Sequence, residues 1–201
     1  MRRSFPLSAI VTALVLAGCA GTGEHRTGSP VAATQDAPAP AGTTTSTTTS
    51  TVASAGVNLT AASGSLASGQ LKLMPMTGGV HVTGTVGGLK PNGSHGFHIH
   101  EKGDCSAVDA SSAGGHFNPA AKPHGRVTNP QHHAGDNDNL VANAEGVATV
   151  NAHFSGVVLG GGGANDVIGK AVVVHADPHD YTSQPAGNAG ARIACGVISA
   201  G

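Results

Sequence analysis

Histidine is the most distinctive component of this sequence of 201 residues, which holds 12 histidines against 10 lysines and arginines together. Histidine is the commonest metal ligand among side chains. In Gly-Phe-His-Ile-His, at residues 96–100, the alternation predicts a strand with Phe97 and Ile99 facing the core. His98 and His100 then share the opposite face, where they can bind one metal ion without distorting the backbone. Such a pair alone is weak evidence for a metal site, because it also fits a polar strand face.

Further potential ligands lie in an irregular stretch between Glu101 and Asn139, where the apolar alternation fails. They are His116 in Gly-His-Phe-Asn-Pro (115–119), His124 in Pro-His-Gly (123–125), and His133 with Asp136 in His-Ala-Gly-Asp (133–136). A long irregular loop is usually functional or disordered, and these polar side chains favour function. Three histidines and a carboxylate supply enough donors for a four-coordinate zinc ion, although any one of these histidines could simply be solvated.

Short strands separated by glycine-rich turns must position these side chains. Alternation over 80–86 predicts one half-buried strand, and four other segments read as strands: 70–76, 147–154, 170–175 and 192–198. His175 ends one of these segments, at a place where a polar side chain often belongs to a site at the rim, although a strand end meeting water fits too. With 31 glycines, 2% aromatic residues and no convincing helical period, the chain is predicted to be an antiparallel sandwich or barrel.

The first 55 residues are predicted to lie outside the folded domain. Residues 1–18 read as a secretory signal, with Arg2 and Arg3 before an apolar run too short to span a membrane. Leu-Ala-Gly-Cys at 16–19 resembles the bacterial lipoprotein signal, which implies cleavage before Cys19 and lipidation of its thiol. An ordinary signal peptide with a stray cysteine is the alternative. Residues 19–55, rich in Thr, Pro and Ala, predict a disordered tether, which leaves 56–201 as one domain.

Charge and cysteine usage narrow the class of protein further. The formal net charge of −1, with no basic patch, argues against a nucleic-acid partner. If Cys19 is lipidated, Cys105 and Cys195 remain. Two cysteines of an exported protein usually form a disulfide, but free thiols or soft metal ligands are competing interpretations.

Five motifs together resemble the copper,zinc superoxide dismutase family, in order and with similar intervals. They are the segments at 96–100, 115–119 and 133–136, Val-Val-His at 173–175, and Gly-Asn-Ala-Gly-Ala-Arg-Ile-Ala-Cys-Gly at 187–196. The resemblance covers about residues 57–199. It implies an all-β fold, an antiparallel Greek-key sandwich or barrel with long metal-binding loops, and the dismutation of superoxide to oxygen and hydrogen peroxide.

The resemblance also implies a role for each matching residue. Copper would be held by His98, His100, His116 and His175, and zinc by His116, His124, His133 and Asp136. His116 would bridge the two ions, Arg192 would guide the anion beside the copper, and Cys105 and Cys195 would form the internal disulfide. The expected setting is antioxidant defence in the cell envelope or periplasm, with the lipid at Cys19 expected in the outer membrane, and a homodimer is left as an option.

One position departs from the family pattern. Family members usually have an aspartate four residues after the equivalent of His175, which hydrogen-bonds one copper-site and one zinc-site histidine. This chain has His179 there, and Asp177 or Asp180 is expected to substitute unless the link is absent. The alternative function is a non-catalytic copper- and zinc-binding envelope lipoprotein on the same fold, against which Arg192 argues because metal storage needs no anion guide.

Overall fold

The computed structural model describes residues 49–201, which form ten β-strands and one short 3-10 helix, Ser111–Ala113, without an α-helix. The predicted signal, Cys19 and most of the predicted tether lie outside the described residues. The strands are β1 (Ala55–Ala61), β2 (Ser68–Met76), β3 (Gly79–Gly87), β4 (Ser94–His95), β5 (Phe97–His100), β6 (Leu140–Val141), β7 (Ala148–Ser155), β8 (Ala171–His175), β9 (Arg192–Val197) and β10 (Ser199–Ala200). Within this range, no helix is long and apolar enough to cross a bilayer.

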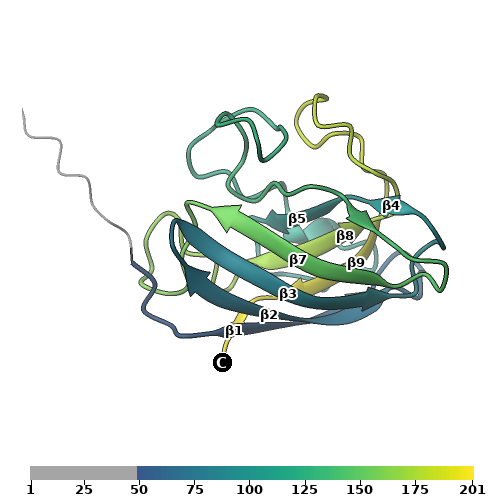
Figure 1. The fold of residues 1–201 in the computed structure, drawn as a ribbon, viewed down its shortest axis with the longest axis horizontal. Coiled ribbons are helices and arrows are strands. Elements are labelled where there is room, and N and C mark those ends of the chain that lie inside the picture. Colours follow the sequence, from purple (N-terminus) through teal and green to yellow (C-terminus); the bar gives the residue numbers. More distant parts are fainter. Residues whose placement is uncertain (1–48) are drawn as a thin grey trace, which may run out of the picture. The chain divides into compact units, whose positions relative to one another are not determined.

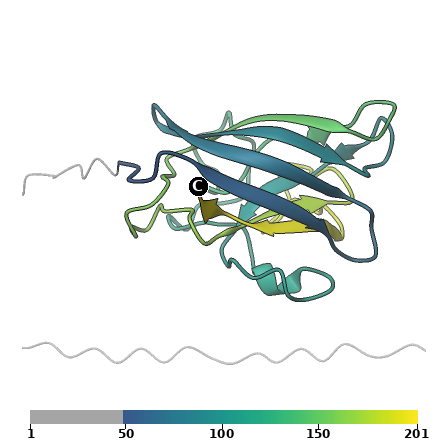
Figure 2. The same cartoon turned by 90° about the horizontal axis from the view of Figure 1, so that it is seen from below.

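The strands form two curved layers that share β1 (Figure 2). Along the main sheet the order is β5-β8-β9-β1-β2-β3-β7, and every strand pair is antiparallel. Residues 55–59 of β1 pair with β2, whereas Thr60 and Ala61 pair with β9, so this strand passes from one layer to the other. Neighbours such as β3 and β7 are far apart in sequence, as Greek-key connections require. The prediction of an all-β antiparallel barrel is confirmed.

Alternating apolar side chains fill the space between the layers. Val80, Val82 and Val86 of β3 are fully buried, as the alternation predicts. Phe97 of β5 and Phe154 of β7 meet across the core with ring centroids 5.9 Å apart. Burying a side chain of this kind contributes about 1.5–3 kcal/mol relative to leaving it exposed. The rigid sheet that results fixes the direction of the polar side chains on its other face.

Two long loops project from the same side of the barrel, one between β5 and β6 and one between β8 and β9 (Figure 1). The first loop also covers the open edge of β5: the amide of Ile99 donates to the carbonyl of Gly135 at 2.9 Å, and the amide of Phe117 donates to the carbonyl of Ile99 at 2.8 Å. A disulfide between Cys105 and Cys195 joins this loop to β9, with 5.7 Å between the Cα atoms. The loops are therefore attached to the sheet where the histidines gather.

Candidate metal centre

Four buried imidazoles form a first cluster on the outer face of β5 and β8. Each offers one ring nitrogen, and the four nitrogens all lie within 4.8 Å of one another; the residues are His98, His100, His116 and His175. Phe97 and Ile99 belong to the hydrophobic core, whereas the rings of His98 and His100 both lie against the ring of His116, with centroids 4.0 and 5.0 Å away, in agreement with the predicted division of the two faces of β5. His116 joins the cluster because it pairs with His100 as an isolated antiparallel bridge. This arrangement of nitrogen donors suits copper.

A second cluster lies directly beside the first, within the loop between β5 and β6. Its donors are again within 4.8 Å of one another and buried, and they come from His116, His124, His133 and Asp136. The Oδ1 atom of Asp136 lies 2.8 Å from Nδ1 of His116, 2.9 Å from Nδ1 of His124 and 3.2 Å from Nδ1 of His133. Three nitrogens around one carboxylate form a donor set typical of zinc.

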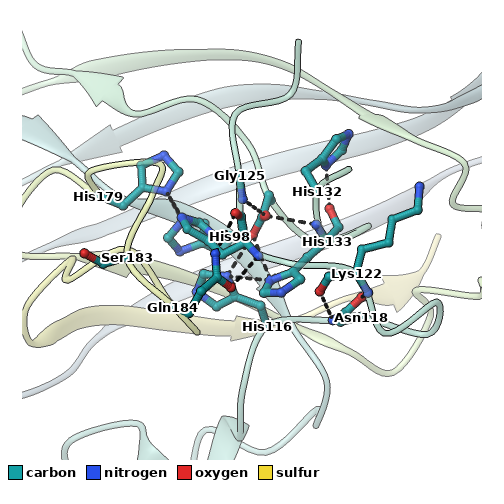
Figure 3. Close-up of polar contacts among 12 residues, drawn as sticks. His98, His116, Asn118, Lys122, Gly125, His132, His133, His179, Ser183 and Gln184 are labelled. Carbon is teal, nitrogen blue, oxygen red and sulfur yellow. Dashed lines mark hydrogen bonds and ion pairs between the residues drawn. The ribbon is translucent and has the colours of Figure 1, made fainter. Parts of the chain in front are cut away.

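His116 belongs to both clusters, and Figure 3 shows its ring near those of His98 and His133. Its Nδ1 faces Asp136, whereas its Nε2 is buried without a hydrogen-bond partner. Nδ1 of His98 is likewise buried and unpartnered. Buried polar atoms are nearly always hydrogen-bonded, so unpartnered nitrogens that converge in one cluster need another explanation. The nitrogen donors, their convergence, and the missing hydrogen-bond partners of His98 Nδ1 and His116 Nε2 all fit a pair of metal ions that share the imidazole of His116.

Burial keeps the imidazoles of the first cluster neutral. It lowers the pKa of His98 well below its ordinary value, the pKa of His100 to about 2 and that of His175 to about 3, and neighbouring histidines add to each decrease. Burial also lowers the pKa of His116, although the carboxylate of Asp136 opposes this change. A neutral imidazole has a free lone pair, so no proton has to leave before these side chains bind a metal ion.

Asp136 is held as a carboxylate despite its burial. Burial alone would raise its pKa, but hydrogen bonds from His116, His124 and His133 and from the amide of Gly125 outweigh that effect and hold the pKa far below its ordinary value. The amide of His133 also donates to this carboxylate, at 3.0 Å. The second cluster therefore contains a fixed negative charge, which a divalent cation would neutralise.

Arg192 is fixed next to the first cluster by two backbone carbonyls. Its guanidinium donates from Nη1 to the carbonyl of Ala110 and from Nη2 to the carbonyl of Gly114, both at 2.7 Å. The carbonyl of Gly114 also accepts a hydrogen bond from Nδ1 of His100 at 2.9 Å. One carbonyl oxygen thus links the predicted anion guide to a predicted copper ligand.

At the position that departs from the family pattern, neither neighbouring acid replaces the aspartate. The carboxylate of Asp180 accepts hydrogen bonds from Thr182, Ser183 and Asn188 instead. The Asp177 carboxylate lies beside Gly190. His179 itself makes the link: its Nδ1 lies 3.0 Å from Nε2 of His98 and 3.1 Å from Nε2 of His124. The expectation that Asp177 or Asp180 substitutes is therefore wrong, because Asp180 bonds within its own loop, Asp177 lies beside Gly190, and His179 occupies the position between the two histidines.

Two side-chain amides that the sequence analysis did not single out hold this region together. Asn139 pairs with the backbone of His179: its Oδ1 accepts from the amide at 3.0 Å and its Nδ2 donates to the carbonyl at 3.1 Å. Gln184 pairs with the backbone of His124 in the same way, at 2.8 and 3.0 Å. Each amide spans 40 to 60 residues of sequence, so no local pattern could have revealed it. His95 is also buried, and its Nδ1 donates to the carbonyl of His175 at 2.9 Å.

Fold and site together define a class: a β-barrel metalloprotein with two adjacent clusters that share an imidazole. A family model described as copper/zinc superoxide dismutase (SODC) matches residues 67–198. A Cu-Zn superoxide dismutase 2 from Aquifex aeolicus is 43% identical over 133 residues, covering 65% of this chain and 78% of that protein. A protein of the same name from Mesembryanthemum crystallinum is 46% identical over 128 residues, covering 61% and 80%.

Solved structures agree with these relatives. A SOD-like protein from Bacillus subtilis is 37% identical with a TM-score of 0.64, covering 71% of this chain and 96% of that one. The clock protein EA4 is 36% identical with a TM-score of 0.66, covering 75% and 96%. The chain belongs to the copper/zinc superoxide dismutase family.

Proposed function

We propose that this chain, an oxidoreductase of the copper/zinc superoxide dismutase family, converts two superoxide ions and two protons to oxygen and hydrogen peroxide at its paired metal clusters. Copper would be held by the first cluster and zinc by the second, with His116 shared between them. The observation that carries this proposal is the pair of buried four-donor sets that meet in one imidazole. When bound, copper supplies one-electron redox chemistry, whereas zinc has none and serves structure and charge.

The residues around the first cluster prepare it for a small anion. Neutral, buried imidazoles leave the guanidinium of Arg192 as a fixed positive charge beside the cluster. Its two carbonyl partners hold the guanidinium in place before substrate arrives, so orientation costs little during the reaction. A fixed cation next to the reacting position attracts superoxide and orients it. A non-catalytic metal-binding lipoprotein would have no use for this arrangement.

Replacement of the shared imidazole tests the proposal. His116→Ala removes one donor from each cluster. We therefore expect the affinity for each metal to fall by about tenfold or more, and superoxide turnover to fall by orders of magnitude. Metal content per chain and superoxide consumption are measured together. His81→Ala is the matched control, because His81 lies on β3 and bonds Asn151 outside both clusters. Wild-type turnover with two metals bound in His116→Ala would refute the shared role.

The setting of the enzyme is a further part of this proposal. We expect residues 1–18 to be removed and Cys19 to be lipidated, so that the residues that follow Cys19 tether the barrel to an envelope membrane. A disulfide between Cys105 and Cys195 supports an oxidising compartment. In a bacterial host, Cys19→Ser should move the protein from the membrane fraction to the soluble fraction. Wild-type protein that is soluble from the start would contradict the anchor, and sedimentation of the purified domain decides between monomer and homodimer.

A further inference from the structure

His179 contacts both metal clusters with a single atom. Its Nδ1 lies 3.0 Å from Nε2 of His98, in the first cluster, and 3.1 Å from Nε2 of His124, in the second (Figure 3). The side chain is buried, and its own Nε2 has no hydrogen-bond partner. No other side chain among residues 49–201 is seen to bond one member of each cluster while belonging to neither.

The positions of the imidazole hydrogens give Nδ1 of His179 one hydrogen-bond donor too many. Nδ1 of His98 is unpartnered within the first cluster, and Nδ1 of His124 faces Asp136 in the second, so these are the atoms that would bind the metals. A neutral imidazole that binds metal through Nδ1 carries its hydrogen on Nε2. Two N–H donors therefore point at Nδ1 of His179, which offers a single in-plane lone pair. Only one of the two hydrogen bonds can be well formed at a time.

The loops, not these hydrogen bonds, set the position of His179. Asn139 holds its backbone at both the amide and the carbonyl, and Gln184 holds the backbone of His124 in the same way. The ring of Tyr181 packs on the His179 ring with centroids 4.1 Å apart, and Arg126 lies over the Tyr181 ring at 3.8 Å. A different side chain at position 179 would thus leave the backbone in place and change only the acceptor presented to the two histidines.

We propose that His179 is a positioning residue whose single lone pair is shared between the two clusters, so that this chain holds zinc less tightly than the same scaffold would with a two-lone-pair acceptor at position 179. The inference rests on the proposed metal pair. It follows from geometry and from acceptor number alone. Partners of metal-bound histidines typically change metal affinity by about 10- to 100-fold, which makes the effect measurable.

Three variants of the full chain separate acceptor number from charge. His179→Asn places a neutral oxygen at the same bond count from Cα as Nδ1 but with two lone pairs, His179→Asp adds a negative charge, and His179→Ala removes the acceptor. Zinc affinity is measured by competition with a chromophoric chelator on the copper-free chain. We expect zinc to bind about tenfold more tightly in both the Asn and the Asp variants and about tenfold more weakly in the Ala variant.

A second readout reports on the hydrogen bonds themselves. In the zinc-loaded, 15N-labelled chain, the imidazole N–H of His124 should be better protected from exchange in His179→Asn than in wild type. The inference is overturned if His179→Asn binds zinc no more tightly than wild type, if only His179→Asp does, or if His179→Ala binds as wild type does. A wild-type chain that takes up neither zinc nor copper would instead refute the proposed function, so the two failures are distinguishable.

Discussion

At the scale of single residues, the carbonyl of Gly114 connects substrate guidance to metal binding. It accepts from Nη2 of Arg192 at 2.7 Å and from Nδ1 of His100 at 2.9 Å. The first bond fixes the cation, and the second fixes the ring so that its Nε2 points into the first cluster. Loss of the guanidinium should therefore affect the reaction more than metal retention, because His100 keeps its own bond to the carbonyl.

Arg192→Ala should slow superoxide turnover by about tenfold or more at low ionic strength while both metals stay bound. The residual turnover should also depend less on salt than wild-type turnover does, because a steering charge is lost. Superoxide consumption over a salt series, with metal content measured in parallel, checks this result. Arg192→Lys is the matched control, since it keeps the charge without the two-carbonyl fork. Full activity of Arg192→Ala at low salt would remove the guiding role.

Single residues also show what the sequence could and could not predict. Local patterns singled out all seven side chains of the two clusters as potential ligands, but their assignment to one copper set and one zinc set came from the family resemblance of the motifs. Asn139 and Gln184 could not be found in this way, since their partners are 40 and 60 residues away. The departure at His179 was visible in the sequence, but its consequence depended on where Nδ1 points within the folded loops.

At the scale of elements, the loop between β8 and β9 depends on close approach at Gly187. This residue has a φ of +68°, and a Cβ added there would lie 2.6 Å from Nε2 of His124 and 2.9 Å from Cβ of His179. Gly162 has nearly the same φ, +67°, yet nothing lies within 4 Å of its Cβ position. Substitution of each glycine by alanine therefore separates the effect of backbone strain, which both positions share, from crowding of the metal centre, which occurs only at Gly187.

Gly187→Ala should weaken zinc binding by about tenfold, because the new methyl group displaces His124. Gly162→Ala should keep wild-type zinc affinity. It should lose only about 1–2 kcal/mol of unfolding free energy, the cost of a positive φ at a residue with a Cβ atom. Chelator competition and urea unfolding on both variants check this expectation. Equal zinc affinity in the two variants would show that the loop relaxes around the added methyl group.

The strands themselves were largely predictable. Alternation over 80–86 predicted β3, which spans Gly79–Gly87, and the other predicted segments match β2, β7, β8 and β9 within two residues at either end. β1 was not predicted as a strand, because Val57 and Leu59 give only two apolar positions next to a polar linker. Its strand conformation comes from pairing with β2 and β9, which are distant in sequence.

At the scale of the whole molecule, the buried histidines make the stability of the metal-free chain depend on pH. In the folded state the pKa of His100 is about 2 and that of His175 about 3, mainly because of burial, against an ordinary value of 6.5. Below about pH 6.5 the unfolded chain therefore takes up protons that the folded chain refuses. Keeping these histidines neutral therefore costs the folded chain nothing above that pH, and the free energy of unfolding decreases as the pH falls below it.

The free energy of unfolding of the metal-free chain should decrease from pH 7 to pH 4, at up to about 1.4 kcal/mol per pH unit for each buried histidine. Urea unfolding of the chelator-treated protein, with its disulfide intact, measures this dependence. A variant with both His100 and His175 replaced by Gln should show a shallower slope. A flat profile between pH 7 and pH 4 would mean that the imidazoles are not buried in the metal-free protein.

The coverage of β5 has a consequence for solubility. Among residues 49–201, the backbone of this strand is paired on its open side only by the loop between β5 and β6, through Phe117 and Gly135, residues next to His116 and Asp136. An uncovered strand edge is a ready template for another chain, and proteins protect such edges to avoid aggregation. The same segment thus gathers the candidate ligands and shields the barrel from self-association, so its position along β5 serves the solubility of the molecule as well as its chemistry.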